Sequence, residues 1–246
     1  MSPTARRLLE RPLLGRVLTG LLAGRVVAGP TADDALRVAR ELVSEGCRVA
    51  LEHAPAPDDD VAAELADLVA RVHAAGLAGD CELTLPVDRL GADATARLAA
   101  LATSSRLAVV LDGRADHPDV PGAGVVVHSA EPFAEDRCRA LADRRVRLVQ
   151  GRGAAADLAF VRCLNVLMAG TGRPVVAATD PRLIAIAGER AAWNGRTPDS
   201  WEYVMPYGIS TLEQHRLVAA GAVVRVAVPS GRGAVALVAR RAGGRA

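Results

Sequence analysis

Residues 173–231, RPVVAATDPRLIAIAGERAAWNGRTPDSWEYVMPYGISTLEQHRLVAAGAVVRVAVPSG, alternate short apolar runs with amphipathic helical stretches. Asp180 and Pro181 suit the N-cap and the first position of a helix. Ser210 stands three residues before Glu213, the spacing of a capping box at a second helix start. Strands are expected at the β-branched runs, namely 175–178, 201–207 and 223–228. This alternation is typical of consecutive βα units in a parallel sheet.

The same alternation extends back through the chain. Further strands are predicted at 48–53, 81–85, 107–112, 124–128 and 146–150, and helices at 32–44, 61–75, 92–103, 135–143 and 157–169. Thr31 is expected to cap the first of these helices. Because the strands come to eight and no GxGxxG turn is present, the sequence predicts an α/β fold of the (βα)8 type, a TIM-like barrel, rather than a Rossmann sheet.

One connection breaks the pattern. Only GRADHPDVPGA, residues 113–123, separates the third strand from the fourth, and its two prolines and two glycines make a poor helix. Parallel neighbours normally need a crossover of about a dozen residues or more. We therefore expect a distorted barrel that lacks one outer helix.

The N-terminal part is expected to be a helical arm, residues 1–46, packed on a single barrel domain, residues 47–246. Its apolar stretch LLGRVLTGLLAGRVVAG is interrupted by Arg16 and Arg25, which disfavours a signal peptide. We expect an amphipathic helix that lies on the body of the protein, with peripheral membrane contact as the alternative. No apolar run reaches the length of a transmembrane segment.

The composition excludes several kinds of chemistry. All 30 basic residues are arginine, so no lysine is present to form a Schiff base or to bind phosphate in a P-loop. The net charge of +2 argues against a nucleic-acid partner. Four cysteines without CxxC spacing indicate free thiols and a cytoplasmic location, and five histidines without a clustered motif predict no metal site.

In such a barrel, functional groups gather where the strands end at their carboxyl side. The residues expected at this rim are His53, Pro86, Asp112, 128–130, 150–152, Thr179, Asp180, Tyr207 and 229–231. Asp112 is the only strong acid among them in the first half of the chain. The rim is therefore polar but sparse.

Several motifs together resemble the proline dehydrogenase family, the flavin-dependent barrels that oxidise L-proline to 1-pyrroline-5-carboxylate. They are VRLVQG at 146–151, RCLNVLMAGTGRPVVAATDP at 162–181, the stretch from 201 to 231 and ARR at 239–241. The resemblance extends from about residue 26 to residue 241. It implies bound FAD, a small proline-like substrate and a quinone as electron acceptor.

The resemblance also implies roles for individual residues. Asp112 and Arg147 take the catalytic positions, while Arg240 and Arg241 match a pair that grips the substrate carboxylate, with Leu148 beside the substrate. Two guanidinium groups suit this task because they offer bidentate, charge-assisted hydrogen bonds. The positions implied for the flavin are Gly113, His128, Val149, Gln150, Gly151, Arg152, Ala178 and Thr179.

The chain departs from the family pattern where substrate and flavin are held. Pro86 and Gln150 replace lysines, Thr179 replaces a histidine and Ala227 replaces a tyrosine. Each lost charge-assisted hydrogen bond costs about 1.5–3 kcal/mol. A second interpretation therefore stays open, in which the chain is a non-catalytic relative that acts as a binding or interaction protein.

Overall fold

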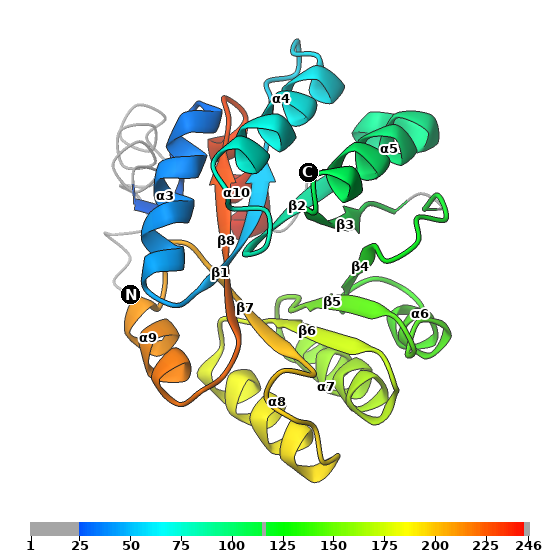
Figure 1. The fold of residues 1–246 in the computed structure, drawn as a ribbon. Helices are drawn as coiled ribbons and strands as arrows, with labels where there is room; N and C mark the ends of the chain where they lie inside the picture. Colours follow the sequence, from blue (N-terminus) through cyan, green and yellow to red (C-terminus); the bar gives the residue numbers. More distant parts are fainter. Residues whose placement is uncertain (1–24, 115–116, 244–246) are drawn as a thin grey trace, which may run out of the picture.

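The computed structural model describes residues 25–114 and 117–243, which form a closed barrel of parallel strands (Figure 1). Its eight strands are β1 (Arg48–His53), β2 (Cys81–Pro86), β3 (Ala108–Asp112), β4 (Gly124–His128), β5 (Arg145–Val149), β6 (Arg173–Ala177), β7 (Glu202–Pro206) and β8 (Val224–Ser230). Each strand pairs with its neighbours in sequence, and β8 closes on β1. The predicted (βα)8 fold is thereby confirmed. The expected N-terminal amphipathic helix lies almost entirely outside the described residues.

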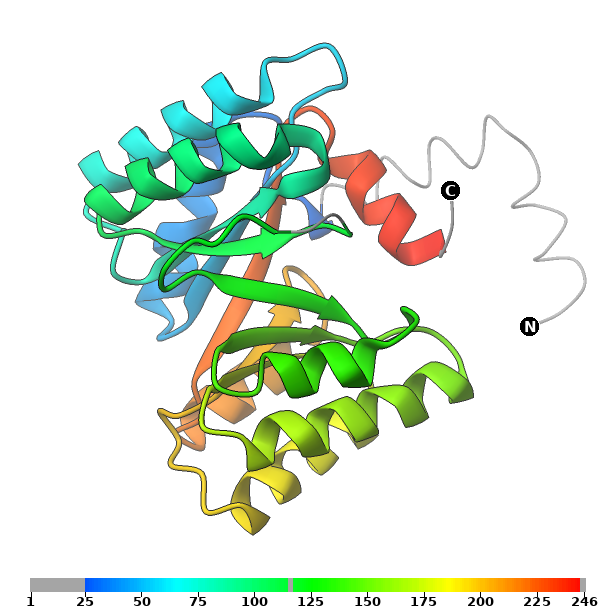
Figure 2. The ribbon, with the colours of Figure 1, turned by 90° about the vertical axis from the view of Figure 1, so that its right-hand side faces the viewer.

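Helices surround this barrel. In chain order they are α3 (Ala32–Ser44), α4 (Val61–Ala74), α5 (Val87–Ser104), α6 (Ala134–Ala140), α7 (Ala154–Ala169), α8 (Pro181–Trp193), α9 (Thr211–Ala219) and α10 (Ala234–Gly243). The sequence analysis did not predict α10. Figure 2 places α10 at one end of the barrel, apart from the two groups of outer helices.

The chain between β3 and β4 contains no helix in its described part, residues 113, 114 and 117–123, as the two prolines predicted. Val120 and Ala123 are buried and join the outer core, so this loop covers the strands in place of a helix. The pairing of β3 with β4 is short and rests on Val110 opposite Gly124 and Leu111 opposite Val125. The missing helix is thus accommodated without opening the barrel.

Two of three predicted helix caps form as expected. Thr31 and Asp34 make a reciprocal capping box at α3, and the Asp180 side chain accepts a hydrogen bond from the Arg182 N–H at α8. The capping box predicted at Ser210 is wrong. Ser210 has a left-handed φ of 55° and its side chain makes no cap bond, because an N-cap side chain reaches the helix N–H groups from extended backbone.

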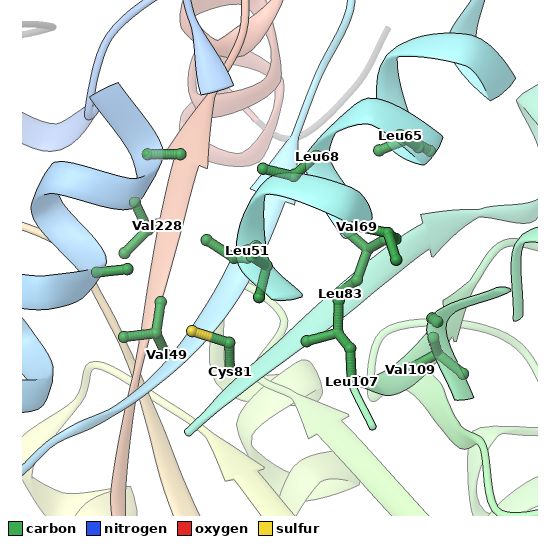
Figure 3. Close-up of a cluster of buried hydrophobic side chains, with 14 of the residues drawn as sticks. Val49, Leu51, Leu65, Leu68, Val69, Cys81, Leu83, Leu107, Val109 and Val228 are labelled. Carbon is green, nitrogen blue, oxygen red and sulfur yellow. The ribbon is translucent and has the colours of Figure 1, made fainter. Parts of the chain in front are cut away.

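The outer faces of the strands bury their apolar side chains against the helices. Leu51 and Leu83 pack against Leu68 and Val69 of α4, and all four are fully buried (Figure 3). A second cluster around Phe160 joins β4–β7 to α6–α9. Complete burial of one such side chain contributes about 1.5–3 kcal/mol, so these two clusters hold the fold together.

The interior of the barrel is largely charged. Every second residue of each strand points inward, and a middle layer of small apolar side chains consists of Ala50, Val175, Val204 and Ala227. Charged side chains lie on both sides of this layer. At the amino ends of the strands they are Arg48, Glu82, Arg145, Arg173, Glu202 and Arg225, and toward the carboxyl ends they are Glu52, Asp112 and Arg147.

Candidate active site at the barrel mouth

A cavity of about 670 Å³ opens at the carboxyl ends of the strands. This volume lies within the range of about 300–1,000 Å³ that is typical of small-molecule sites. Its walls combine apolar and charged groups, and the charged and polar ones are Glu52, Asp112, His128, Arg147, Gln150, Arg152, Asp157, Thr179, Asp180, Tyr207 and Arg241. A cavity of this size and lining suits a polar small molecule.

Arg147 of β5 forms the charged floor of the cavity. Its Nη1 lies 3.3 Å from Glu52 Oε1 and 3.3 Å from Thr84 Oγ1, and its Nη2 donates to Glu82. Only 3% of the side chain is exposed. Because buried charges must be paired to be tolerated, the two glutamates hold this guanidinium in one position.

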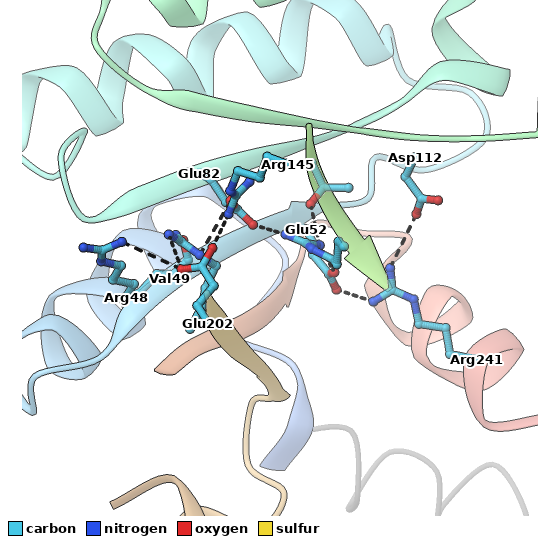
Figure 4. Close-up of polar contacts among 11 residues, drawn as sticks. Arg48, Val49, Glu52, Glu82, Asp112, Arg145, Glu202 and Arg241 are labelled. Atoms are coloured by element: carbon cyan, nitrogen blue, oxygen red, sulfur yellow. Dashed lines mark hydrogen bonds and ion pairs between the residues drawn. The ribbon is translucent and has the colours of Figure 1, made fainter. Parts of the chain in front are cut away.

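Arg241 of α10 reaches over the mouth from the opposite side. It donates to Glu52 and lies 3.9 Å from Asp112 Oδ2 (Figure 4). The charge of Glu52 raises the pKa of Arg241. The side chain of Arg241 is 43% exposed, so a ligand can reach it from solvent, unlike the buried Arg147.

Asp112 faces Arg241 from the end of β3. Its Oδ1 lies 3.3 Å from His128 Nε2, at the end of the neighbouring strand β4. Burial alone would raise the pKa of Asp112, but the hydrogen bond and charge of His128, together with Arg241 and Arg147, lower it. Asp112 is therefore a stable carboxylate at neutral pH and a good partner for a positively charged group.

Gln150 links the two loops that follow β5 and β6. Its Oε1 accepts hydrogen bonds from the N–H groups of Thr179 and Asp180 at 3.1 and 3.3 Å, and its Nε2 donates to Asp157 Oδ1 at 3.3 Å. The amide is thus held by contacts within the protein. Beside it, α7 begins after Gly153 without a side-chain cap, so its first N–H groups stay available to a ligand.

The structure brings most of the predicted site residues to this one cavity. Asp112, Arg147, Arg241, His128, Val149, Gln150, Gly151, Arg152, Ala178 and Thr179 all line it. Three others lie elsewhere. Leu148 is fully buried on the outer face of β5, Gly113 adjoins Asp88 of α5, and Arg240 lies on an exposed part of α10. These three positions therefore do not contribute to the cavity.

Glu52 was missed by the sequence analysis, which placed His53 at the rim instead. His53 points outward, where it contacts Ser230 Oγ at 2.9 Å and Glu64 Oε2 at 3.2 Å. Successive residues of a strand face opposite sides, so only one of Glu52 and His53 can line the interior. The apolar outward residues Val49 and Leu51 would have assigned Glu52 to the inside.

The fold and this site define a class of protein: a closed βα barrel with a small-molecule cavity at its mouth, in which an acid and an arginine face each other. Among the described residues, no group of three His, Cys, Asp or Glu side chains is placed to hold a metal ion. Within the same residues, no helix has the length and apolarity that crossing a bilayer would require.

Solved structures of three proline utilization A proteins are similar to this fold. The protein of Bdellovibrio bacteriovorus, inactivated by N-propargylglycine, matches with a TM-score of 0.79 and 15% sequence identity. The match covers 93% of this chain and 33% of the Bdellovibrio chain. A mutant protein from Bradyrhizobium japonicum has a TM-score of 0.67 at 20% identity, and the match covers 96% of this chain and 32% of that chain. The protein of Corynebacterium freiburgense has a TM-score of 0.66 at 16% identity, and the match covers 100% of this chain and 34% of that chain.

This chain thus spans about a third of the length of these proteins. No family profile matches the sequence, and no curated protein resembles it closely enough to match. At such low identities the likeness establishes the fold, and the function must be argued from the site.

The lining residues fit a flavin nucleotide at one end of the cavity. The uncapped start of α7, with Arg152 and Gly153 in the preceding loop, offers N–H groups and a cation to a pyrophosphate, whereas the Gly151 N–H already donates to Ser129 Oγ at 3.0 Å. Val149 and Ala178 form an apolar wall beside it. At the ring end, the Gln150 oxygen accepts from Thr179 and Asp180 and its nitrogen donates to Asp157, which leaves one of its two N–H groups for a ligand.

Proposed function

We propose that the protein is a proline dehydrogenase-like oxidoreductase that binds FAD and a small cyclic amino acid at the barrel mouth. The observation that carries this proposal is the pairing of Asp112 with Arg241, 3.9 Å apart, at the edge of a cavity of about 670 Å³. The fold shared with proline utilization A proteins and the motif resemblance supply the substrate class. The carboxylate and the ring nitrogen of proline carry opposite charges, as this pair does.

In this proposal Arg241 moves away from Asp112 and the amino acid takes the space between them, because 3.9 Å leaves no room for a ligand. Arg241 takes the carboxylate, for which a guanidinium provides two parallel hydrogen bonds. Asp112 takes the ring nitrogen in its protonated form, and its lowered pKa keeps it charged for this task. The nitrogen would then release one proton to solvent before the neighbouring carbon gives up a hydride, because its lone pair forms the C=N bond of the product. The apolar middle layer, with Val204 and Ala227 at the cavity, accommodates the carbon ring. The substrate is thereby oriented at both ends, as hydride transfer requires.

The flavin would occupy the side of the cavity between β4 and β6. When bound, FAD supplies a hydride acceptor for the carbon next to the substrate nitrogen. Arg152, Gly153 and the start of α7 would hold its phosphates, and Val149 with Ala178 would contact its apolar surface. We further propose a quinone as the electron acceptor and a cytoplasmic location, in which the four buried free thiols remain reduced.

A second candidate is a non-catalytic barrel that binds a small molecule without flavin. Two contacts favour it: Gln150 is held by Thr179, Asp180 and Asp157, and Glu52 already neutralises Arg241. In this case the same cavity binds an amino acid, but no oxidation follows.

Flavin retention separates the two candidates. The purified protein, incubated with FAD and passed through gel filtration, is expected to keep the flavin absorbance and then to reduce a dye when proline is added. A protein that takes up no FAD and still binds proline in calorimetry excludes the oxidoreductase and supports the second candidate. A protein that neither takes up FAD nor binds proline refutes the proposed site.

The role of Arg241 is tested by Arg241→Met, which keeps the apolar length of the side chain. Loss of a charge-assisted hydrogen bond of about 1.5–3 kcal/mol predicts a proline affinity roughly 10- to 150-fold weaker. Arg97→Met, on an exposed part of α5, is the matched control and should leave affinity unchanged. Equal affinity in both variants would remove Arg241 from the site.

A further inference from the structure

The amino ends of the strands contain a second charged group, far from the mouth along the barrel axis. Arg48, Arg145, Arg173 and Arg225 extend from β1, β5, β6 and β8, and we call them the basal arginine cluster. Glu82 and Glu202 are the acids among them. Four cations therefore meet two anions in a space that is mostly shielded from solvent.

Both glutamates are already shared among several arginines. Glu82 contacts Arg145 and also Arg147 of the cavity floor, and Arg225 Nε lies 3.6 Å from its Oε2. Glu202 contacts Arg145, and its Oε2 lies 3.2 Å from Arg225 Nη2 and 3.8 Å from Arg48 Nη1. No contact joins Arg173 to either carboxylate, although Glu82 Oε2 itself has no hydrogen-bond partner among the described residues.

Several N–H groups of the cluster have no hydrogen-bond acceptor among the described residues. They are Arg173 Nε, Arg173 Nη2, Arg145 Nη1 and Arg225 Nε, and all are buried. A buried donor that lacks a partner costs about 1–3 kcal/mol, and such a group in a native protein calls for a water or an ion. Burial first, and then repulsion from Arg48, Arg145 and Arg225, lower the pKa of Arg173.

We propose that the basal arginine cluster binds one small oxyanion of the phosphate or carboxylate class. Nε and Nη2 form one edge of the Arg173 guanidinium, and this edge matches two oxygens of an oxyanion in a bidentate contact. The anion also offsets the excess of positive charge, which Asp199 at the surface near Arg173 reduces only in part. Arg173 is partly exposed and makes no side-chain hydrogen bond, so it can turn to admit the ion.

This site is independent of the proposed oxidoreductase function, and phosphate is the probe. The midpoint of thermal unfolding is measured while phosphate replaces chloride, which has no pair of oxygens for the edge of Arg173, at constant ionic strength. We expect a saturable rise with a dissociation constant below about 1 mM, reaching about 5–10 °C at a 100-fold excess. No saturable rise up to about 100 mM phosphate overturns the proposal.

Two variants locate the effect. Arg173→Met removes the unpartnered cation and should abolish the response to phosphate, whereas Arg97→Met should keep it in full. Should Arg173→Met fail to fold, Arg48→Met, at the half-exposed edge of the cluster, is expected to weaken the response at least tenfold. A full response in the folded Arg173 or Arg48 variant places the ion elsewhere, such as at the start of α7, and refutes the basal site.

Other anions define the ligand class. Acetate and phosphate are compared by the concentration at which each saturates the rise in unfolding midpoint. The anion that saturates at the lower concentration gives the ligand class, carboxylate or phosphate, and either result supports an oxyanion site. Saturation by chloride alone contradicts it, because a halide makes no use of the bidentate edge of Arg173.

Discussion

Replacement of Glu82 by glutamine should strongly destabilise the protein. Glu82 is fully buried and contacts the guanidinium groups of Arg145, Arg147 and Arg225. Burial alone would raise its pKa, but these three arginines outweigh burial and lower it, so the carboxylate is charged in the folded protein. Glutamine keeps the shape of the side chain and removes the charge on which the three cations depend.

The magnitude follows from the number of partners left behind. Removing one member of a buried ion pair costs about 3–5 kcal/mol, because the remaining charge stays buried without compensation. For a domain with a total stability of about 5–15 kcal/mol, this is a large fraction. At about 2–4 °C for each kcal/mol, the unfolding midpoint should fall by roughly 6–20 °C.

Urea denaturation of Glu82→Gln provides the measurement. The matched control is Glu41→Gln, which breaks an exposed pair with Arg37 on α3 and should cost about 0.3–0.5 kcal/mol. The double variant Glu82→Leu with Arg147→Met should recover part of the loss, since apolar groups can replace a buried ion pair. If Glu82→Gln costs no more than the control, the interior charges do not hold the barrel in the way argued above.

Three further predictions concern pH, a loop contact and a helix cap. Because the folded pKa values of Glu82 and Glu202 lie below the ordinary glutamate value of about 4.3, their stabilisation is full above that pH and is lost as pH falls below it, as acid titration of unfolding should reveal. Gln150→Ala leaves the Thr179 and Asp180 N–H groups to water and should cost about 0.5–1.5 kcal/mol, with faster amide exchange in that loop; unchanged exchange would contradict the contact. Thr31→Ala removes the capping box of α3 and should cost about 0.5–2 kcal/mol in urea unfolding, whereas Ser210→Ala should cost less because Ser210 makes no cap bond.

The sequence alone determined the fold and most of its elements. Apolar runs of strand length alternate with helical periodicity, and both patterns are local, so they identify β1 and α3 without knowledge of the rest of the chain. The same holds for the caps at Thr31 and Asp180 and for the lost helix after β3, where two prolines and two glycines exclude it. The capping box predicted at Ser210 was wrong because the turn after β7, and not the residue type, imposes the left-handed backbone at this position.

The tertiary structure decided which side chains meet. Arg147 binds Glu52 and Glu82, which are 95 and 65 residues away, and Arg241 reaches Glu52 across 189 residues. Such pairs depend on strand register and on the closure of β8 against β1, which no local pattern specifies. Periodicity can say that a residue faces inward; only the closed barrel brings one inward charge opposite another, and the mouth cavity and the basal arginine cluster both arise from that closure.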